Sequence, residues 1–320
     1  MCGHCGCGKT TAASILNLQT GTHTALEHGA PDSIPHHHEH QHGHAGHHGH
    51  AETHAHRHEH QHEHSHQHIH GDTSHVGHEL ENSHPEHRHL DTSVVELEAR
   101  ILAKNDALAT KNRAWFAQWD ILALNLVSSP GAGKTTLLER TIRDLKAELK
   151  LFVVEGDQST ARDGQRIRAA GAPVVQVNTG TGCHLEADMV ARGLRELNPS
   201  RNSIVMIENV GNLVCPALFD LGEWAKVVVL SVTEGEDKPL KYPHMFRAAR
   251  LMVLNKIDLL PHVEFDTEHA ASHARQVNPD IVILPISART GQGLDAWYGW
   301  LRALSGGRAS LIVDNRHRRA

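Results

Sequence analysis

The sequence predicts an α/β fold, with a mostly parallel sheet flanked by helices, for the part of the 320-residue chain that follows position 90. Short runs of Val, Ile and Leu recur there, and amphipathic helical patterns separate most of them. Continuous apolar strands that alternate with helices are typical of parallel sheets covered on both faces. The predicted strands are Ile121–Val127, Leu151–Val154, Val174–Val177, Ile204–Ile207, Val227–Val232, Leu251–Leu254 and Ile281–Leu284.

Helical periodicity is clearest at Thr135–Leu149, Glu186–Leu197 and Leu294–Leu304. One more helix is expected to run towards Trp119, with Asp91-Thr92-Ser93 as its cap candidates. Its apolar residues recur at helical spacing and are Val94, Val95, Leu97, Ile101, Leu102 and Leu108. Ligands of such sheets bind beyond the carboxyl ends of the strands, so functional residues are expected there.

Histidine divides the chain into regions. Of its 32 His residues, 23 lie between His36 and His89, in a segment with almost no large apolar side chains. Such a segment cannot offset the entropy lost on folding and is predicted to be disordered without metal. Neutral imidazoles could bind several nickel, zinc or copper ions there. The predicted regions are a Cys cluster and linker (1–35, weakly helical from residue 11), the His-rich segment (36–90), the catalytic domain (91–305) and a basic tail (306–320).

Charge and hydropathy exclude several classes of protein. The formal charge of −6 gives no electrostatic reason to expect nucleic-acid binding or membrane binding. The N-terminus lacks the apolar core of a signal peptide, and no apolar run is long enough to span a membrane. These observations predict a cytoplasmic protein, in which the five cysteines serve as thiols and metal ligands rather than disulfides.

A phosphate-binding loop lies between the first predicted strand and the next helix, in the sequence SSPGAGKTT (128–136). Its glycines let backbone N–H groups point at phosphate oxygens, Lys134 can reach the β and γ phosphates, and the Thr135 hydroxyl can bind Mg²⁺. This context predicts a P-loop NTPase. The literal consensus pattern occurs instead at Gly3–Thr10, but no strand precedes it there. The residues expected to contact the nucleotide phosphates are Gly131, Ala132, Gly133, Lys134, Thr135 and Thr136.

The base-recognition residues favour GTP over ATP. The strand Leu251–Leu254 leads into Asn255-Lys256-Ile257-Asp258, an N-K-x-D pattern. The Asp258 carboxylate can accept hydrogen bonds from guanine N1–H and N2–H₂, while Asn255 binds the other edge and Lys256 lies along the ring. Further on, Ser287-Ala288-Arg289 is similar to a loop whose backbone N–H meets guanine O6. The alternative is that these segments are an ordinary strand-end turn and helix start.

Two acidic segments at predicted strand ends are candidates for the Mg²⁺ and water sites, namely Glu155-Gly156-Asp157 and Glu208-Asn209-Val210-Gly211. We expect Asp157 near the metal or the attacking water, and Glu208 to reach Mg²⁺ through a water molecule. Lys134, Asp157 and Glu208 are thus the candidate catalytic residues, although Asp157 could be a turn residue only. The pattern reveals no Gln or Arg to stabilise the transferred phosphate, so slow turnover that depends on a partner or a dimer is expected.

Two sets of cysteines are candidate metal sites. Cys2, Cys5 and Cys7 are spaced so that three thiolates converge on one ion, either nickel in a square plane or zinc in a tetrahedron, with a disulfide as the alternative. Cys183-His184 and Cys215 each follow a strand on the nucleotide side of the sheet. Adjacent residues point apart on an extended chain, so a two-fold dimer is expected to complete this site. Cys215 could instead be a small buried hydrophobe.

Together these motifs resemble the HypB family, the nickel-insertion GTPases of nickel–iron hydrogenase maturation. The matching pieces are the N-terminal cysteine cluster, the His-rich insert, SSPGAGKTT, EGD, TGCHLEADM, ENVGNLVCP, NKID and SAR. The resemblance implies a GTPase that dimerises across its nucleotides. It also implies a high-affinity nickel site at Cys2, Cys5 and Cys7, and a weaker nickel or zinc site at Cys183, His184 and Cys215. The implied partners are a HypA-type accessory protein and the hydrogenase large-subunit precursor.

Two alternatives to this function can be weighed on the sequence. A nickel store with an inert nucleotide fold is disfavoured by the intact set of Lys134, Thr135, Asp157 and Asp258. The related urease-accessory GTPase is disfavoured because that family is not expected to combine an N-terminal cysteine cluster with TGCH. Nucleotide can alter metal affinity only if the metal prefers one state of the protein, so a metallochaperone requires such a coupling.

Overall fold

The computed structural model describes residues 13–26, 85–158 and 160–306. The N-terminal cysteines, the His-rich segment up to residue 84 and residues 307–320 lie outside these ranges. Within these described ranges, nine strands form one sheet in the order β2-β1-β5-β4-β6-β3-β7-β8-β9, and the seven strands from β5 to β9 in this order run parallel. The strands are β1 (Ser14–Asn17), β2 (His23–Ala25), β3 (Leu122–Ser128), β4 (Leu151–Asp157), β5 (Val174–Asn178), β6 (Ile204–Glu208), β7 (Ala225–Ser231), β8 (Ala249–Asn255) and β9 (Val282–Pro285).

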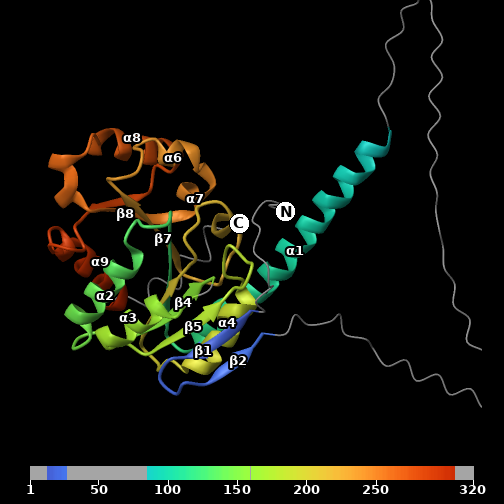
Figure 1. The fold of residues 1–320 in the computed structure, drawn as a ribbon, viewed down its shortest axis with the longest axis horizontal. Coiled ribbons are helices and arrows are strands. Elements are labelled where there is room, and N and C mark those ends of the chain that lie inside the picture. Colours follow the sequence, from blue (N-terminus) through green and yellow to red (C-terminus); the bar gives the residue numbers. More distant parts are fainter. Residues whose placement is uncertain (1–12, 27–84, 159, 307–320) are drawn as a thin grey trace, which may run out of the picture. The chain divides into compact units, whose positions relative to one another are not determined.

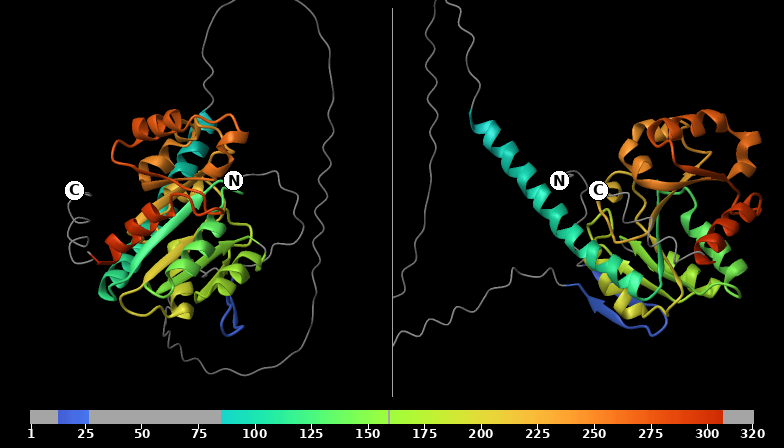
Figure 2. Two further views of the ribbon diagram at one scale, coloured as in Figure 1. Left: turned by 90° about the vertical axis from the view of Figure 1, so that its left-hand side faces the viewer. Right: turned by 180° about the vertical axis from the view of Figure 1, so that it is seen from behind.

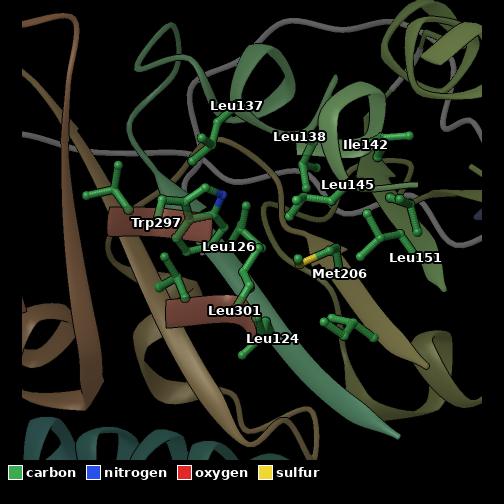
Figure 3. Packing of buried hydrophobic residues seen from close by; sticks show 14 of the residues in the cluster. Leu124, Leu126, Leu137, Leu138, Ile142, Leu145, Leu151, Met206, Trp297 and Leu301 are labelled. Atoms are coloured by element: carbon green, nitrogen blue, oxygen red, sulfur yellow. The ribbon is translucent and has the colours of Figure 1, made fainter. Parts of the chain in front are cut away.

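One face of the sheet packs against α2 (Lys134–Leu145), α3 (Arg162–Ala170) and α9 (Leu294–Gly306). Figure 3 shows the centre of this layer, where Leu124 and Leu126 of β3 meet Leu137 of α2 and Trp297 of α9. The Trp297 indole is fully buried, and its N–H donates to the Thr141 hydroxyl at 2.8 Å. This bond satisfies the one polar atom of the indole and joins α9 to the helix that follows the phosphate loop.

The opposite face is covered by α1 (Pro85–Gln118), α4 (Ala187–Leu197), α7 (Pro243–Ala248) and α8 (Thr267–Val277). Short helices α5 (Cys215–Leu218), α6 (Lys238–Lys241) and η1 (Ile257–His262) lie in the connections. Alternate residues of each strand point to opposite faces, so apolar side chains on both faces account for the continuous apolar runs. Each of the seven predicted strands is present and parallel, which confirms the predicted fold class.

The N-terminal hairpin of β1 and β2 was not predicted. Residues 11–35 were expected to be weakly helical, but Ser14–Asn17 pairs antiparallel with β5 and extends the sheet (Figure 1). Ile15 is 1% exposed and packs in the same cluster as Val175 and Val177. Pairing across more than 150 positions of sequence stabilises this short strand, and local periodicity carries no trace of such a contact.

Helix α1 begins at Pro85, so the predicted caps at 91–93 lie inside the helix. Proline suits the first turn because its φ is preset and the missing N–H would have no partner there. Two asparagines attach α1 to α4, which lies beside its C-terminal part in Figure 2. Asn105 Oδ1 accepts from Ala187 N at 2.9 Å, and Asn112 Nδ2 donates to Ala187 O at 2.8 Å. Asn105 thereby satisfies a backbone N–H at the start of α4 that has no partner within that helix.

Within the described ranges, no helix combines the length and the apolar character needed to cross a membrane.

Candidate nucleotide and metal sites

A cavity of about 470 Å³ opens at the carboxyl edge of the sheet, where the loops after β3, β4 and β6 meet. It is bounded by the phosphate loop, the start of α2, the ends of β4 and β6, and one side of α3. Predicted residues from three separate segments are therefore brought together here. The lining residues include Gly131, Gly133, Lys134, Thr135, Thr136, Glu155, Asp157, Asp163, Arg166 and Glu208.

The backbone of the phosphate loop is tightly constrained where the loop meets α2. Gly133 has a φ of 100°, and a side chain there would place its Cβ 2.5 Å from Asn255 Nδ2, so this position requires glycine. Helix α2 begins at the next residue, Lys134, whose ammonium donates to Ser128 Oγ at 2.8 Å. Burial lowers the pKa of Lys134. Ser128, the departure from the common motif, thus supplies an acceptor for this lysine.

Two glutamates face the cavity from neighbouring strands. Glu155 of β4 and Glu208 of β6 are paired in register, and both project to the face that α2 covers. Glu208 Oε1 accepts from the Thr135 hydroxyl at 2.6 Å, whereas Oε2 of each glutamate is buried without a hydrogen-bond partner among the described atoms. Burial raises the pKa of Glu208 to about 7, against the opposing effects of Lys134 and Thr135. Burial, followed by the charge of Glu208, raises the pKa of Glu155 well above its usual range.

Asp157 lines the same cavity but also organises its own turn. Its carboxylate accepts from Gln158 N at 2.7 Å, Thr160 N at 2.9 Å and the Thr160 hydroxyl at 2.8 Å. The turn function that was the alternative for Asp157 is therefore present in the structure. Its place in the cavity leaves the predicted role at the metal or water compatible with this geometry.

The predicted guanine-binding residues are joined to the phosphate loop by hydrogen bonds. Asn255 Nδ2 donates to Ala132 O at 2.9 Å, and Lys256 Nζ donates to Gly131 O at 2.7 Å. Ala288 N donates to Asn255 Oδ1 at 3.1 Å. The remaining pair is also in contact, because the Ser287 hydroxyl donates to Asp258 Oδ1 at 2.6 Å. The two base-recognition segments therefore form one assembly beside the loop, although 29 positions of sequence separate Asp258 from Ser287.

Cys183, His184 and Cys215 converge in the structure. One ligand atom from each lies within 4.8 Å of the others, and the two sulfur atoms are 2.9 Å apart. The expectation that Cys183 and His184 point apart is wrong, because the chain bends at these residues instead of continuing as a strand. The His184 ring packs on Phe219 at 3.9 Å between centroids, and its Nε2 is buried without a hydrogen-bond partner among the described atoms. Burial lowers the pKa of His184, which favours the neutral imidazole that metals bind.

One short segment connects the cavity to this triad. Asn209 directly follows Glu208, and its Oδ1 accepts from Leu185 N at 3.1 Å, beside His184. Further along the same segment, a Cβ on Gly211 would lie only 3.1 to 3.2 Å from atoms of Pro130 in the phosphate loop. The segment then reaches Cys215. The segment from Glu208 to Cys215 therefore links the acidic strand end to one residue of the triad, approaches the phosphate loop at Pro130, and bonds the residue next to His184.

Sequence reasoning named Glu155 only as part of the Glu155-Gly156-Asp157 segment, without a role, and missed Asp163 and Arg166, which line the cavity from α3. Glu155 could have been found from strand alternation, because it shares a face with Val153 and Asp157 and therefore points towards α2. Arg166 follows a loop whose path the sequence does not indicate, so no comparable signal existed. The three N-terminal ligands, Cys2, Cys5 and Cys7, lie outside the described residues.

Comparison with known proteins fits this geometry. Residues 122–285 match the family described as "CobW/HypB/UreG, nucleotide-binding domain". A hydrogenase maturation factor HypB from Rhizobium leguminosarum bv. viciae is 57% identical over 216 residues, which cover 68% of this chain and 72% of that protein. The chain belongs to the HypB branch of this family.

Two solved HypB structures have the same fold. HypB from Archaeoglobus fulgidus has a TM-score of 0.60 at 39% identity, and the match covers 63% of this chain and 99% of that one. HypB from Helicobacter pylori, solved in complex with nickel, has a TM-score of 0.59 at 37% identity, with 63% and 95% covered. Family membership establishes the predicted resemblance and a P-loop nucleotide-binding fold for this chain.

Proposed function

We propose that the protein is a GTP-hydrolysing nickel metallochaperone for nickel–iron hydrogenase maturation, in which the nucleotide state controls the movement of nickel. The observation that carries the proposal is the segment from Glu208 to Cys215. It begins at the acidic wall of the phosphate cavity, contacts Pro130 through Gly211, and ends at a ligand of the Cys–His–Cys triad. A change at the phosphates therefore has a short covalent route to the metal ligands.

In the nucleotide cavity, backbone N–H groups of residues 131–133 bind phosphate oxygens, and Lys134 binds the β and γ phosphates. Thr135 and Asp157 are the residues that would hold Mg²⁺, with Glu208 bound through water. The unpartnered buried oxygens of Glu155 and Glu208 fit a cation at this place. Magnesium neutralises charge on the phosphates when bound. Asp157 orients the attacking water, and Asn255 and Asp258 select guanine.

Nickel is the cargo of the triad. Cys183 and Cys215 supply thiolates and His184 a neutral imidazole, a donor set suited to nickel or zinc. Three ligands leave room for one more from a second copy of the chain, and we propose a homodimer whose formation depends on GTP. Cys2, Cys5 and Cys7 form the high-affinity nickel site in this proposal. The partners are a HypA-type accessory protein and the hydrogenase large-subunit precursor, and the location is the cytoplasm, where thiols stay reduced.

Lys134→Ala tests whether hydrolysis and metal binding are separable. The substitution removes the cation that neutralises the β and γ phosphates, so GTP hydrolysis should fall by at least about 100-fold. Nickel binding at Cys2, Cys5 and Cys7 should be unchanged, because these ligands are on another segment. The measurements are phosphate release and equilibrium dialysis with nickel.

The matched control is Lys150→Ala, which removes an exposed lysine from the connection after α2 and should leave both measurements unchanged. Loss of nickel at the N-terminal site in Lys134→Ala would contradict separable modules. Absence of GTP hydrolysis by the unsubstituted protein would instead favour a nickel store.

A further inference from the structure

Arg166 lines the phosphate cavity from helix α3, although no sequence pattern identified an arginine there. Among the described side chains that line the cavity, Lys134 and Arg166 carry the positive charge. The negative charges come from three carboxylates at the ends of β4 and β6, namely Glu155, Asp157 and Glu208, and from Asp163 on α3. A cavity that binds a polyphosphate against this acidic background needs each of its cations.

Two carboxylates and a hydroxyl hold the guanidinium in place. Arg166 Nη2 donates to Glu139 Oε2 at 2.6 Å and to Thr136 Oγ1 at 3.3 Å, and Nη1 donates to Asp163 Oδ1 at 3.0 Å. These three bonds involve three of the five N–H donors that a guanidinium carries. One N–H on Nη1 and the N–H on Nε remain outside these contacts. The Arg166 guanidinium is thus held in a fixed orientation beside α2, and two of its N–H groups are available to donate to an anion.

Arg166 and Glu208 contact different residues at the start of α2. Glu208 contacts Thr135, whereas Arg166 contacts Thr136, the next residue of the helix. The Lys134 and Thr135 side is where the terminal phosphate and its cation lie in loops of this type. The guanidinium therefore approaches from the side of the phosphates that GDP and GTP share.

We propose that Arg166 is a nucleotide-binding arginine that contacts a phosphate common to GDP and GTP, with Glu139 and Asp163 as the residues that position it. This inference rests on the proposed GTPase function. It assigns Arg166 to ground-state binding, so its loss should raise the Kd of both nucleotides and leave kcat at saturating GTP nearly unchanged. Arginine suits this position because its planar fork matches phosphate oxygens.

The test measures Kd for fluorescent GDP and for a fluorescent, non-hydrolysable GTP analogue, together with kcat, in the full-length protein. Arg166→Ala should weaken both nucleotides by a similar factor, roughly ten- to a hundredfold, as expected for a charge-assisted hydrogen bond. Arg166→Lys keeps the charge but not the fork, so it should recover only part of the affinity. It also serves as the second variant if Arg166→Ala does not fold.

Two control variants show whether Arg166 contacts a phosphate or only joins α3 to α2 through its bond to Glu139. Arg143→Ala removes a different arginine that also bonds Glu139, at 3.1 Å, from the exposed side of α2, and it should change Kd by less than about twofold. Glu139→Ala removes one of the two carboxylates that position Arg166 but keeps the arginine and its bond to Asp163, so both nucleotides should be weakened by clearly less than in Arg166→Ala.

Three outcomes would overturn the proposal. They are wild-type affinity in Arg166→Ala, an equal loss in Glu139→Ala, and a fall in kcat with unchanged affinity for GDP. If the unsubstituted protein binds neither nucleotide, the proposed GTPase function fails. If it binds both and Arg166→Ala binds them equally well, only the role of Arg166 fails.

Discussion

Two buried glutamates determine the electrostatics of the nucleotide cavity. Glu155 and Glu208 lie side by side in a cavity that we propose for an anionic ligand, and burial raises the pKa of each. Like charges in such a place are unfavourable unless protons or cations compensate them. Lys134 compensates in part, and a magnesium ion with the nucleotide would complete the balance. We therefore expect the cavity to bind a metal–nucleotide complex more tightly than a free nucleotide.

Asp258→Asn tests base recognition. A carboxylate accepts from guanine N1–H and N2–H₂, whereas an amide presents one donor and one acceptor. Affinity for GTP should therefore fall by roughly a hundredfold or more, and affinity for xanthosine triphosphate, which has a carbonyl at position 2, should rise. Competition binding with both nucleotides measures this exchange. Equal weakening of both nucleotides would mean that Asp258 only supports Ser287, to which it is hydrogen-bonded.

The site residues that could be predicted from the sequence lie within short contiguous motifs. Lys134, Asn255 and Asp258 each stand at a fixed offset in a short pattern. In the structure their side chains contact Ser128, Ala132 and Ser287, respectively. Glu155 and Arg166 depend on strand direction and on the path of a loop, which a motif does not encode. The bend at Cys183-His184 belongs to the same class, since it brings together neighbours that an extended chain would separate.

Polar contacts hold helix α1 against the rest of the nucleotide-binding fold. Arg113 Nη2 donates to both carboxylate oxygens of Asp220, at 2.7 and 2.6 Å, and Gly222 N donates to the same group at 2.9 Å. Burial alone would raise the pKa of Asp220, but the bonds from Gly222 and Arg113 outweigh it and lower the pKa to about 2. The carboxylate therefore stabilises the folded protein only while it is ionised.

Asp220→Asn should lower the free energy of unfolding by about 1–2 kcal/mol at neutral pH. Because the folded pKa is depressed, this contribution is complete above the unfolded value near 4. It should shrink as the pH falls from there towards 2. Urea unfolding of wild type and variant between pH 3 and 7 measures the difference.

The control for that series is Asp188→Asn, which breaks a half-exposed pair with Arg192 and should cost less than about 1 kcal/mol. A difference between wild type and Asp220→Asn that stays constant down to pH 3 would contradict the assigned role of the carboxylate.

Elements with strong local patterns were predictable, and those formed by distant contacts were not. The buried parallel strands and α2, α4 and α9 follow from apolar periodicity alone. The β1–β2 hairpin is short and takes its stability from β5, so no local pattern reveals it. Helix α1 was predicted, but its start at Pro85 lies within a His-rich composition that does not indicate a helix.

For the molecule as a whole, we propose that the His-rich segment and the nucleotide-binding domain act separately. Replacing residues 36–89 with a Gly/Ser linker of equal length should lower the number of nickel ions bound per chain. It should leave GTP turnover within about twofold of wild type, because the described contacts between α1 and the rest of the domain begin at Asn105. Nickel dialysis and phosphate release measure the two effects. A matching fall in turnover would contradict the role of this segment as a metal buffer.

We propose above all that the nucleotide state sets the nickel affinity of the triad formed by Cys183, His184 and Cys215. The most direct measurement is a nickel titration, with zinc in parallel, of the GDP-loaded protein and of protein loaded with a non-hydrolysable GTP analogue. Cys2, Cys5 and Cys7 are substituted and residues 36–89 are replaced, so that the measured nickel binding comes from the triad. The fraction of dimer is followed in each titration. The nickel affinities of the two states should differ at least about fivefold, and the dimer fraction should change with the nucleotide, because nucleotide can alter metal affinity only through a coupled change of state. Equal nickel affinity in both states would contradict this proposal.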